Sequence, residues 1–226
     1  MKFIIMFSVL FLWLTDIHSQ DRTVSKNSTP FKIARLKYSG GGDWYNDPSA
    51  EVNMMKYLKE NTTVDTDEPL FYSVDIASDD IFKYPFILIT GHGNIDLSEA
   101  EAIRLRKYCE SGGFLYADDD YGMDAAFRRE IRKVFPNEEL KELSFSNKIY
   151  ASHFNFPNGL PKIHEHDGKP PQGFGIFSSG RLCVYYTYET NISDGWADPR
   201  EHDDSPEKRE EALKMGVNII VYSLMN

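Results

Sequence analysis

Two histidines, His164 and His166, stand two residues apart in the stretch IHEHD, with Glu165 between them. In an extended backbone, side chains two apart share a face, so the imidazoles could converge while Glu165 points away. A transition metal accepts both imidazoles but needs a third ligand from elsewhere in the chain. A loop that holds its shape by hydrogen bonds explains the same residues, so both interpretations stay open.

Three consecutive carboxylates, Asp118, Asp119 and Asp120, follow the apolar run FLYA. Adjacent carboxylates repel one another unless a divalent cation binds them or one of them has a raised pKa. Alternatively, one or two of them cap the next helix near its positive end while the others are solvated. The cluster is therefore a candidate cation site, with helix capping as the structural alternative.

Two further residues sit in glycine-rich turns. His92 lies between Gly91 and Gly93, where it could face a cleft as an acid, a base or a metal ligand, or simply be exposed. Trp44 follows SGGGD and could stack on a sugar or a base, or seal the edge of a sheet. No Lys or Thr follows the glycines, so a flexible turn is favoured over a phosphate-binding loop.

The elements that must position these residues follow from apolar patterns. We expect strands at 31–38, 70–76, 86–90 and 114–117, and helices within 97–113 and within 123–135. A further helix is expected to begin with Asp47 as its N-cap and Pro48 as its first residue. Ser98 and Glu101 form a capping-box pattern at the start of the second helix. The run FILIT is almost wholly apolar, which indicates a strand buried on both faces, as in a parallel sheet.

The pattern changes after residue 172. The segments 173–177 and 181–189, joined by Ser178, Ser179 and Gly180, predict an antiparallel hairpin, and a last helix opens at Ser205–Pro206. The end of that helix, VNIIVY, would also fit a strand. Together these elements predict an α/β, flavodoxin-like three-layer sandwich with a mostly parallel sheet and a C-terminal antiparallel hairpin.

In an open parallel sheet, ligands bind outside the carboxyl ends of the strands, near the point where the strand order reverses. In a flavodoxin-like order the first and third strands are neighbours and the fourth adjoins the third. The loops 39–45, 91–94 and 118–122 would then meet at one edge. This convergence is the strongest functional signal in the sequence.

The N-terminus has the pattern of a secretory signal peptide over residues 1–19. Lys2 precedes an apolar run over 3–14, and the small residue Ser19 suits cleavage before Gln20. The run is shorter than the roughly 20 residues of a membrane-spanning helix. We therefore expect a soluble periplasmic or extracellular protein without stable membrane insertion, with a flexible tail over 20–30 and a single domain over 31–226.

The net charge and the absence of certain motifs argue against several classes of function. A formal net charge of −10 argues against a nucleic-acid partner, which requires a basic surface. The two cysteines, Cys109 and Cys183, are expected to be buried free thiols rather than a disulfide. The chain has no G-x-S-x-G elbow, no H-E-x-x-H, and no G-x-G-x-x-G after its first strand.

Several long motifs carry a family resemblance that covers about residues 31 to 224. These are KYSGGGDWYNDPSA, TGHGN, GGFLYADDDYGMD, NGLPKIHEHDGKPPQGFGIF and YYTYETNISDGWADP. They resemble a bacterial family whose domain is described only as a domain of unknown function. That family is similar to the class I glutamine amidotransferase-like and trehalose-utilisation-like (ThuA-like) branch of flavodoxin-type folds. The resemblance implies an amidotransferase-like scaffold without its nucleophile, because Ala117, Asp118 and Asp119 stand where a Cys would be needed.

If the chain folds like these relatives, its loops form one pocket at the carboxyl edge of the sheet. The expected pocket residues are Trp44, His92, Asp118, Asp119, Asp120, Tyr121, His164, Glu165, His166 and Trp196. We expect it to bind a polar small molecule, such as a carbohydrate, or a partner protein. The alternative is a metal-assisted hydrolase in which His92 or Asp119 is the catalytic base and His164 and His166 bind a divalent metal.

Overall fold

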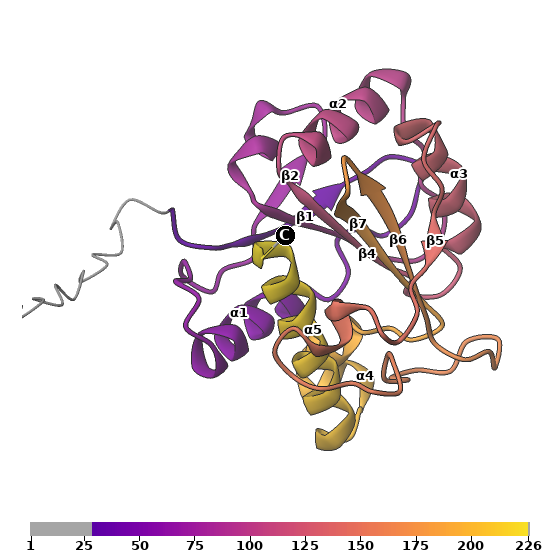
Figure 1. Ribbon diagram of the computed structural model, residues 1–226. Coiled ribbons are helices and arrows are strands. Elements are labelled where there is room, and N and C mark those ends of the chain that lie inside the picture. The colour runs from indigo at the N-terminus through magenta and orange to yellow at the C-terminus, as the bar shows by residue number, and fades with distance from the viewer. Residues whose placement is uncertain (1–28, 226) are drawn as a thin grey trace, which may run out of the picture.

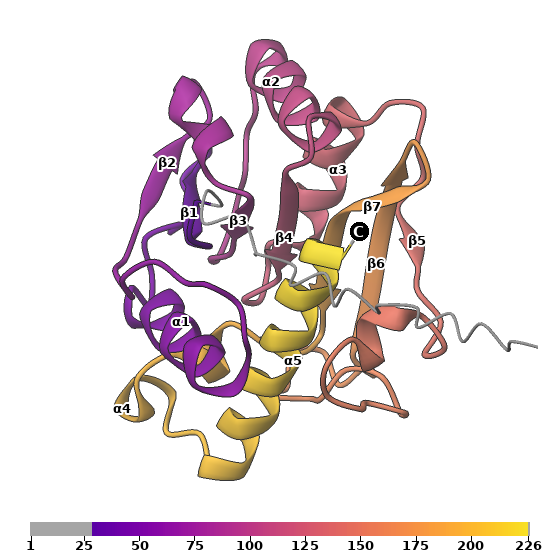
Figure 2. The same cartoon turned by 60° about the vertical axis from the view of Figure 1, so that its left-hand side comes forward.

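The computed structural model describes residues 29–225, so the predicted signal peptide and most of the predicted tail lie outside the described residues. Seven strands form one sheet in the order β2-β1-β3-β4-β7-β6-β5 (Figure 2). The strands are β1 (Ile33–Lys37), β2 (Ser73–Asp75), β3 (Phe86–Ile89), β4 (Phe114–Asp118), β5 (Lys141–Glu142), β6 (Gln172–Ser178) and β7 (Arg181–Tyr188).

The strand order confirms the predicted flavodoxin-like topology. Strands β2, β1, β3, β4 and β7 pair in parallel, whereas β6 is antiparallel to both β7 and β5. Ser179 and Gly180 join β6 to β7 with φ of 52° and 81°, as a two-residue hairpin turn of the favoured twist requires. The hairpin thus adds β7 to the parallel sheet beside β4.

Helices cover both faces of the sheet and complete three layers (Figure 1). The helices are α1 (Ser49–Asn61), α2 (Glu99–Glu110), α3 (Asp124–Val134), α4 (Pro199–His202) and α5 (Pro206–Met225), with short 3-10 turns η1 (Asp79–Lys83), η2 (Lys148–Ala151) and η3 (Asp194–Trp196). Helices α2 and α3 lie on one face, and α1 and α5 lie on the other (Figures 1 and 2). Each face has its own apolar core.

Strand β4 shows why the sequences of the central strands are continuous apolar runs. Phe114 and Tyr116 pack into the core under α1 and α5, while Leu115 and Ala117 pack into the core under α2 and α3. Successive side chains of a strand point to opposite faces, so a strand covered on both sides needs apolar residues throughout. The carboxyl end of β4 is where this run gives way to aspartates.

The ends of the helices fit the sequence with one correction. Helix α2 begins after Ser98 with the predicted capping box to Glu101. The N-cap of α1 is Pro48 rather than the predicted Asp47. Asp47 has a left-handed φ of 41°, and its carboxylate contacts His202 instead of the helix end.

The structure also answers the questions about the last helix and the two cysteines. The segment VNIIVY is helical and belongs to α5, while β5 and α4 were not predicted. Cys109 and Cys183 are both buried free thiols. Within residues 29–225, no helix has the length and the apolar character needed to cross a membrane.

Candidate functional site

A shallow hollow of about 350 Å³ lies beyond the carboxyl ends of the parallel strands. Its lining residues are His92, Asp120, Tyr121, His164, Glu165, His166, Asn191, Asp194 and His202. The three loops expected to meet do so, because Asp43 N donates to the carbonyl of His92 (3.3 Å) and Asn46 Nδ2 donates to Asp120 Oδ2. The predicted convergence at this edge is confirmed.

The three consecutive aspartates point in three directions. Asp118 is the last residue of β4 and accepts hydrogen bonds from the backbone and hydroxyl of Ser193 (2.6 and 2.7 Å). Asp119 turns to the opposite face and accepts from the backbone N–H of Met123 (2.8 Å), just before α3. Of the three, only Asp120 lines the hollow. Strand alternation places Asp118 and Asp119 on opposite faces. Asp120 follows the end of β4, and the turn of the chain there brings its carboxylate to the hollow.

Burial raises the pKa of all three aspartates. Desolvation raises the pKa of Asp118 to about 6, against the hydrogen bonds from Ser193 and Thr187, which lower it. Desolvation likewise raises the pKa of Asp119 to about 7. For Asp120, burial followed by the charge of Asp194 raises the pKa to about 10, so Asp120 holds a proton at neutral pH.

A buried arginine fixes the loop that carries Asp43 and Asp47. Arg35 of β1 is fully buried and forms two hydrogen bonds to Glu51 of α1 (2.6 and 3.0 Å). Its Nη1 donates to the carbonyls of Trp44 (2.9 Å) and Asn46 (3.0 Å). The planar guanidinium binds Glu51 with one edge and the loop carbonyls with another, so it holds the backbone of this loop in place.

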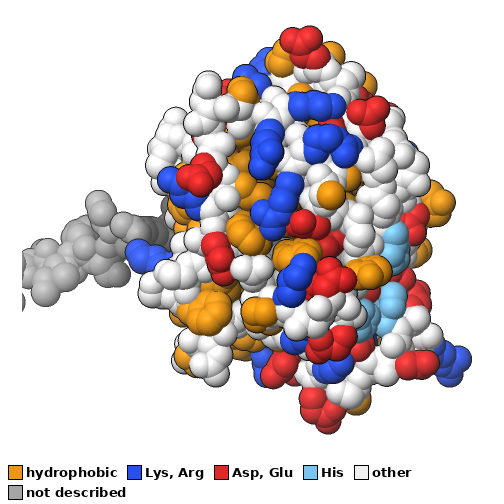
Figure 3. All heavy atoms as spheres, turned by 90° about the vertical axis from the view of Figure 1, so that its right-hand side faces the viewer, with side chains coloured by type: hydrophobic (Ala, Val, Ile, Leu, Met, Phe, Trp, Pro, Cys, Tyr) orange, Lys and Arg blue, Asp and Glu red, His pale blue; other side chains and the backbone are white. Residues whose placement is uncertain are grey.

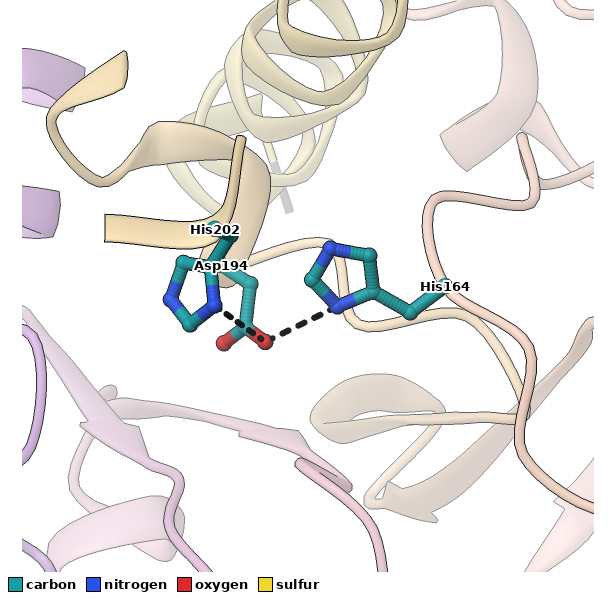
Figure 4. Close-up of side chains that lie close together, drawn as sticks. All are labelled: His164, Asp194 and His202. Atoms are coloured by element: carbon teal, nitrogen blue, oxygen red, sulfur yellow. Dashed lines mark ion pairs between the residues drawn. The ribbon is translucent and has the colours of Figure 1, made fainter. Parts of the chain in front are cut away.

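Three side chains from separate segments meet at one end of the hollow. His164 Nδ1 lies 3.1 Å and His202 Nδ1 lies 3.9 Å from Asp194 Oδ2. Figure 4 shows both imidazole rings with a nitrogen turned towards this oxygen. One ligand atom from each of the three residues lies within 4.8 Å of the others. Two imidazoles and a carboxylate at such spacing form a potential metal-binding group.

Further carboxylates lie against the far side of both rings. Asp204 Oδ2 lies 2.9 Å from His164 Nε2, and Asp47 Oδ2 lies 3.1 Å from His202 Nε2. The second contact is an ion pair rather than a well-aligned hydrogen bond. A carboxylate on Nε2 holds the proton there and leaves Nδ1 free to ligate, as second-layer carboxylates do around metal-bound histidines.

The same carboxylates favour the protonated histidines when no metal is bound. The hydrogen bond to Asp194 raises the pKa of His164. The contact with Asp47, reinforced by the charge of Asp194, raises the pKa of His202 to about 9. Burial alone would raise the pKa of Asp194, but His164 and its other partners lower it. A proton and a metal ion would therefore compete for this group.

The site is acidic, and few positively charged side chains balance its negative charge. Seven aspartates surround it: Asp43, Asp47, Asp118, Asp119, Asp120, Asp194 and Asp204. Within residues 29–225, every ion pair that these carboxylates make is with a histidine. Figure 3 shows histidine side chains close together at one edge of the surface, bordered by acidic ones. Positive charge must therefore come from protons or from a bound cation.

The ring of His166 is buried and has no hydrogen-bond partner. Its side chain is 3% exposed, and neither ring nitrogen has a hydrogen-bond partner. Its Nδ1 lies 4.0 Å from Asp119 Oδ2, and Tyr121 packs edge-on against the ring at 5.1 Å. Burial lowers the pKa of His166, which favours the neutral imidazole. Buried polar groups usually have hydrogen-bond partners, so His166 is a candidate ligand contact.

His92 also lines the hollow and forms a pair with Asp43. Its Nδ1 lies 3.1 Å from Asp43 Oδ2, and its backbone N–H donates to the other oxygen of Asp43. The ring is about half exposed and also lies 3.5 Å from Asp120 Oδ2. Asp43 therefore orients the imidazole and favours a proton on Nδ1, which leaves Nε2 as a basic nitrogen.

Comparison with known families supports the resemblance seen in the sequence. Residues 32–224 match the model of a family described as a domain of unknown function, DUF4159. The chain belongs to this family. No curated protein matches it. The DUF4159 match spans every residue of the site, from Arg35 to Asp204.

Of the remaining predicted pocket residues of this DUF4159 domain, two line the hollow and two do not. Tyr121 and Glu165 line the hollow. Trp44 is partly buried against the core under α2 and α3, next to Lys37, and does not line the hollow. Trp196 is fully buried, and its indole N–H donates to the carbonyl of Ala212 (2.9 Å). Trp196 thus anchors the segment that carries Asp194 and does not itself face a ligand.

The sequence interpretation missed Asp47 as a site residue, as well as Asn191, Asp194 and His202. Asp194 stands two residues before Trp196 in the SDGW motif, where the indole drew attention instead. His202 ends the four-residue helix α4, which has no apolar periodicity to reveal it. The available signal was the density of polar groups over 191–204, immediately after the last parallel strand.

Larger hollows elsewhere lack such chemistry. One, of about 580 Å³, lies near the start of the described chain and is lined by Phe82, Tyr84, Pro85 and Tyr108 among others. Another, of about 450 Å³, lies between α3 and the residues after it. Neither contains a histidine or an aspartate. The smaller hollow at the strand ends is therefore the candidate site on chemical grounds.

Proposed function

We propose that this domain binds a divalent metal ion through His164, Asp194 and His202, and binds a polar ligand beside the ion. The observation that carries the proposal is the pair of imidazole Nδ1 atoms turned towards one carboxylate oxygen. Three protein ligands leave coordination positions open, as in metal sites that act on or bind exogenous molecules. The hollow lies directly beside these positions.

The spacing of the donor atoms suits a metal ion. With metal–ligand bonds of about 2.0–2.1 Å, two ligands in tetrahedral arrangement lie about 3.4 Å apart. The observed separations of 3.1 and 3.9 Å bracket that value, so small side-chain movements would complete the geometry. Zn²⁺ and Mn²⁺ both accept this mixture of nitrogen and oxygen ligands.

The polar lining favours a small molecule rich in hydroxyl groups, such as a carbohydrate. Asn191 and Glu165 offer hydrogen-bonding groups, and the residue Tyr121 is 54% exposed. An aromatic face beside polar groups suits stacking against a sugar. A side chain of a partner protein could fill the same hollow, and a binding screen with sugars and with protein partners distinguishes these two ligands.

A competition titration tests the metal site. Wild-type protein without a His tag is titrated with Zn²⁺ against a chromophoric chelator, next to His164→Ala, His202→Ala and Asp194→Asn. We expect each variant to lose at least tenfold in affinity, because each removes one of three ligands. His153→Ala is the matched control, since His153 is exposed and contacts Asn61 away from the site. Equal affinities in all five proteins would refute the proposal.

Metal-assisted hydrolysis is a second candidate function, favoured by the pair of His92 and Asp43. If His164, Asp194 and His202 held a divalent ion, the ion would supply Lewis-acid chemistry, and an oriented imidazole in the same hollow could act as a general base. Asp119 is a weaker candidate base, because it is buried and bound to the backbone of Met123. In this function, His92 would be the general base.

Turnover of a substrate panel tests this second function. Aryl esters, aryl phosphates and aryl glycosides are incubated with metal-loaded wild type, His92→Ala, Asp43→Asn and Asp119→Asn. We expect His92→Ala to lose about 100-fold or more in rate. It should retain the metal, since His92 is outside the proposed ligand set. An unchanged rate in His92→Ala would exclude this residue as the base, and no turnover in any protein would leave binding as the function.

Export is also part of the proposal. Lys2, the apolar run over 3–14 and Ser19 support removal of residues 1–19 and a periplasmic or extracellular location. The net charge of −10 supports a partner other than a nucleic acid. N-terminal sequencing of the mature protein tests the cleavage, and a chain that begins at Met1 in the cytoplasm would contradict it.

A further inference from the structure

A second group of carboxylates adjoins the proposed metal site and contains the same Asp194. One oxygen each from Asp47, Asp120 and Asp194 lies within 4.8 Å of the others. The three come from different parts of the fold: the loop before α1, the turn after β4, and η3. The side chains of Asp120 and Asp194 are only 2% and 4% exposed, and that of Asp47 is 18% exposed. Carboxylates that are this close and this little exposed to solvent repel one another unless positive charge lies between them.

No lysine or arginine within residues 29–225 forms an ion pair with these three carboxylates. Among the described residues, the ion pairs of Asp47, Asp120 and Asp194 are with histidines alone. An ion with oxygen ligands would supply positive charge between the three carboxylates.

Buried polar groups without partners provide an independent indication of a missing ion. Asn191 is 4% exposed, and its Nδ2 donates to Asp120 Oδ1 and Asp194 Oδ2, at 2.9 Å each. Its Oδ1 has no partner. The ring of His166, in the same hollow, also has none. Buried polar atoms rarely lack partners, so both groups point to a ligand in the hollow.

We propose that Asp194 bridges two divalent cations, one held by His164 and His202 and the other by Asp47 and Asp120. This inference rests on the proposed function, because the first ion is the one described there. A carboxylate has two oxygens and can bind one ion with each. Paired ions in such sites lie about 3.5–4 Å apart and can hold a water molecule or an anionic oxygen between them.

The two positions differ in chemistry. The first has two nitrogen ligands and suits Zn²⁺ or Mn²⁺, whereas the second has only carboxylates and suits Mn²⁺ or Mg²⁺. Mn²⁺ is therefore the probe that both positions accept. It also reports proximity, because two Mn²⁺ ions about 4 Å apart couple magnetically and lose the six-line spectrum of an isolated ion.

The experiment is Mn²⁺ titration with paramagnetic resonance on untagged full-length protein. The variants are Asp120→Asn and Asp47→Asn, which test the second position from separate loops, and His164→Ala with His202→Ala, which tests the first. Asp167→Asn is the control, because its side chain is half exposed on the loop of the histidines. Thermal melting checks that each protein is folded.

We expect two ions and a coupled spectrum in wild type and the control, and one uncoupled ion in Asp120→Asn and in Asp47→Asn. One ion in wild type, unaffected by either aspartate change, would overturn the second position and leave the proposed function standing. Loss of all Mn²⁺ in both aspartate variants would show a single site built from all five residues. No binding in wild type would overturn both proposals together.

Discussion

Glu189 accepts a hydrogen bond from Lys162 at 2.9 Å, and this contact ties the loop of His164 and His166 to the end of β7. The Glu189 carboxylate is fully buried and also accepts from the backbone N–H groups of Asp167 (3.1 Å) and Lys169 (3.3 Å). Burial alone would raise the pKa of Glu189, but these donors lower it. One acidic side chain therefore fixes a loop of eight residues, 162–169, on which two histidines of the site depend.

Glu189→Gln should destabilise the protein by about 1–3 kcal/mol, because the amide nitrogen would face donors that need an acceptor. Urea unfolding measures the change. Glu165→Gln is the matched control, since Glu165 pairs with the same lysine at 3.5 Å but its side chain is 75% exposed, and its effect should stay within about 0.5 kcal/mol. Similar losses in both variants would argue against a special role for Glu189.

Asp204→Asn should weaken metal binding about 10–100-fold, because Asp204 holds the Nε2 proton of His164 and thereby leaves Nδ1 for the ion. The chelator competition titration provides the measurement. Asp203→Asn serves as control: Asp203 is exposed and has a left-handed φ of 53°, which Asn also adopts readily. If both substitutions leave the affinity unchanged, Asp204 does not orient a ligand.

Glu130 provides a pH-dependent test of the scaffold, far from the metal ligands. Its buried carboxylate accepts from Leu97 N (2.9 Å), Arg129 Nε (2.7 Å) and Lys133 Nζ (2.7 Å). Burial opposes ionisation, but these contacts outweigh it and lower the pKa of Glu130 in the folded protein. A carboxyl with a lowered folded pKa stabilises the protein above its unfolded pKa of about 4.3 and loses this contribution as the pH falls through the folded pKa.

Glu130→Gln should therefore be less stable than wild type by about 1–2 kcal/mol at pH 7, allowing for the solvent around Arg129 and Lys133. The difference should shrink steadily below about pH 4. Urea unfolding at several pH values follows it, with exposed Glu138→Gln as control. A difference that is constant from pH 7 to pH 3 would mean that the charge of Glu130 is irrelevant to stability.

Metal removal should lower stability in wild type but not in Asp194→Asn. An ion that binds only the folded protein adds about 2.7 kcal/mol when its free concentration is one hundred times its dissociation constant. Thermal melting with Zn²⁺ and then with EDTA measures this contribution. Equal shifts in wild type and Asp194→Asn would assign the effect to sites other than the proposed one.

The fold was predictable from the sequence because its signals are local. The apolar run at Phe86–Ile89 reports burial on both faces, and Ser98 with Glu101 marks the start of α2 within four residues. The strand order then follows from the rules of doubly wound sheets, which bring the first, third and fourth loops together. These three loops contributed His92 and Asp120, which the sequence had selected.

The rest of the site depends on contacts between distant segments. His164 and His202 are brought together by η3 and α4, which are too short to have a periodic pattern. The hydrogen bonds from Asn53 to the carbonyl of Trp196 and to Asp198 place that segment against α1. No local rule distinguishes Trp196 as an anchor from Trp196 as a ligand contact, because both uses favour an aromatic residue after a turn. Asp118 and Asp120 likewise differ only in which way the chain turns after β4.

The most direct test of the metal site is metal content by mass spectrometry on mature, untagged protein, for wild type, the His164→Ala, His202→Ala double variant and the His153→Ala control. The structure predicts at least one equivalent of a divalent transition metal in wild type and the control, and almost none in the double variant. Wild-type protein that is folded, metal-free and unable to take up Zn²⁺ or Mn²⁺ would contradict the metal site, and His164, Asp194 and His202 would then be a structural ion-pair network.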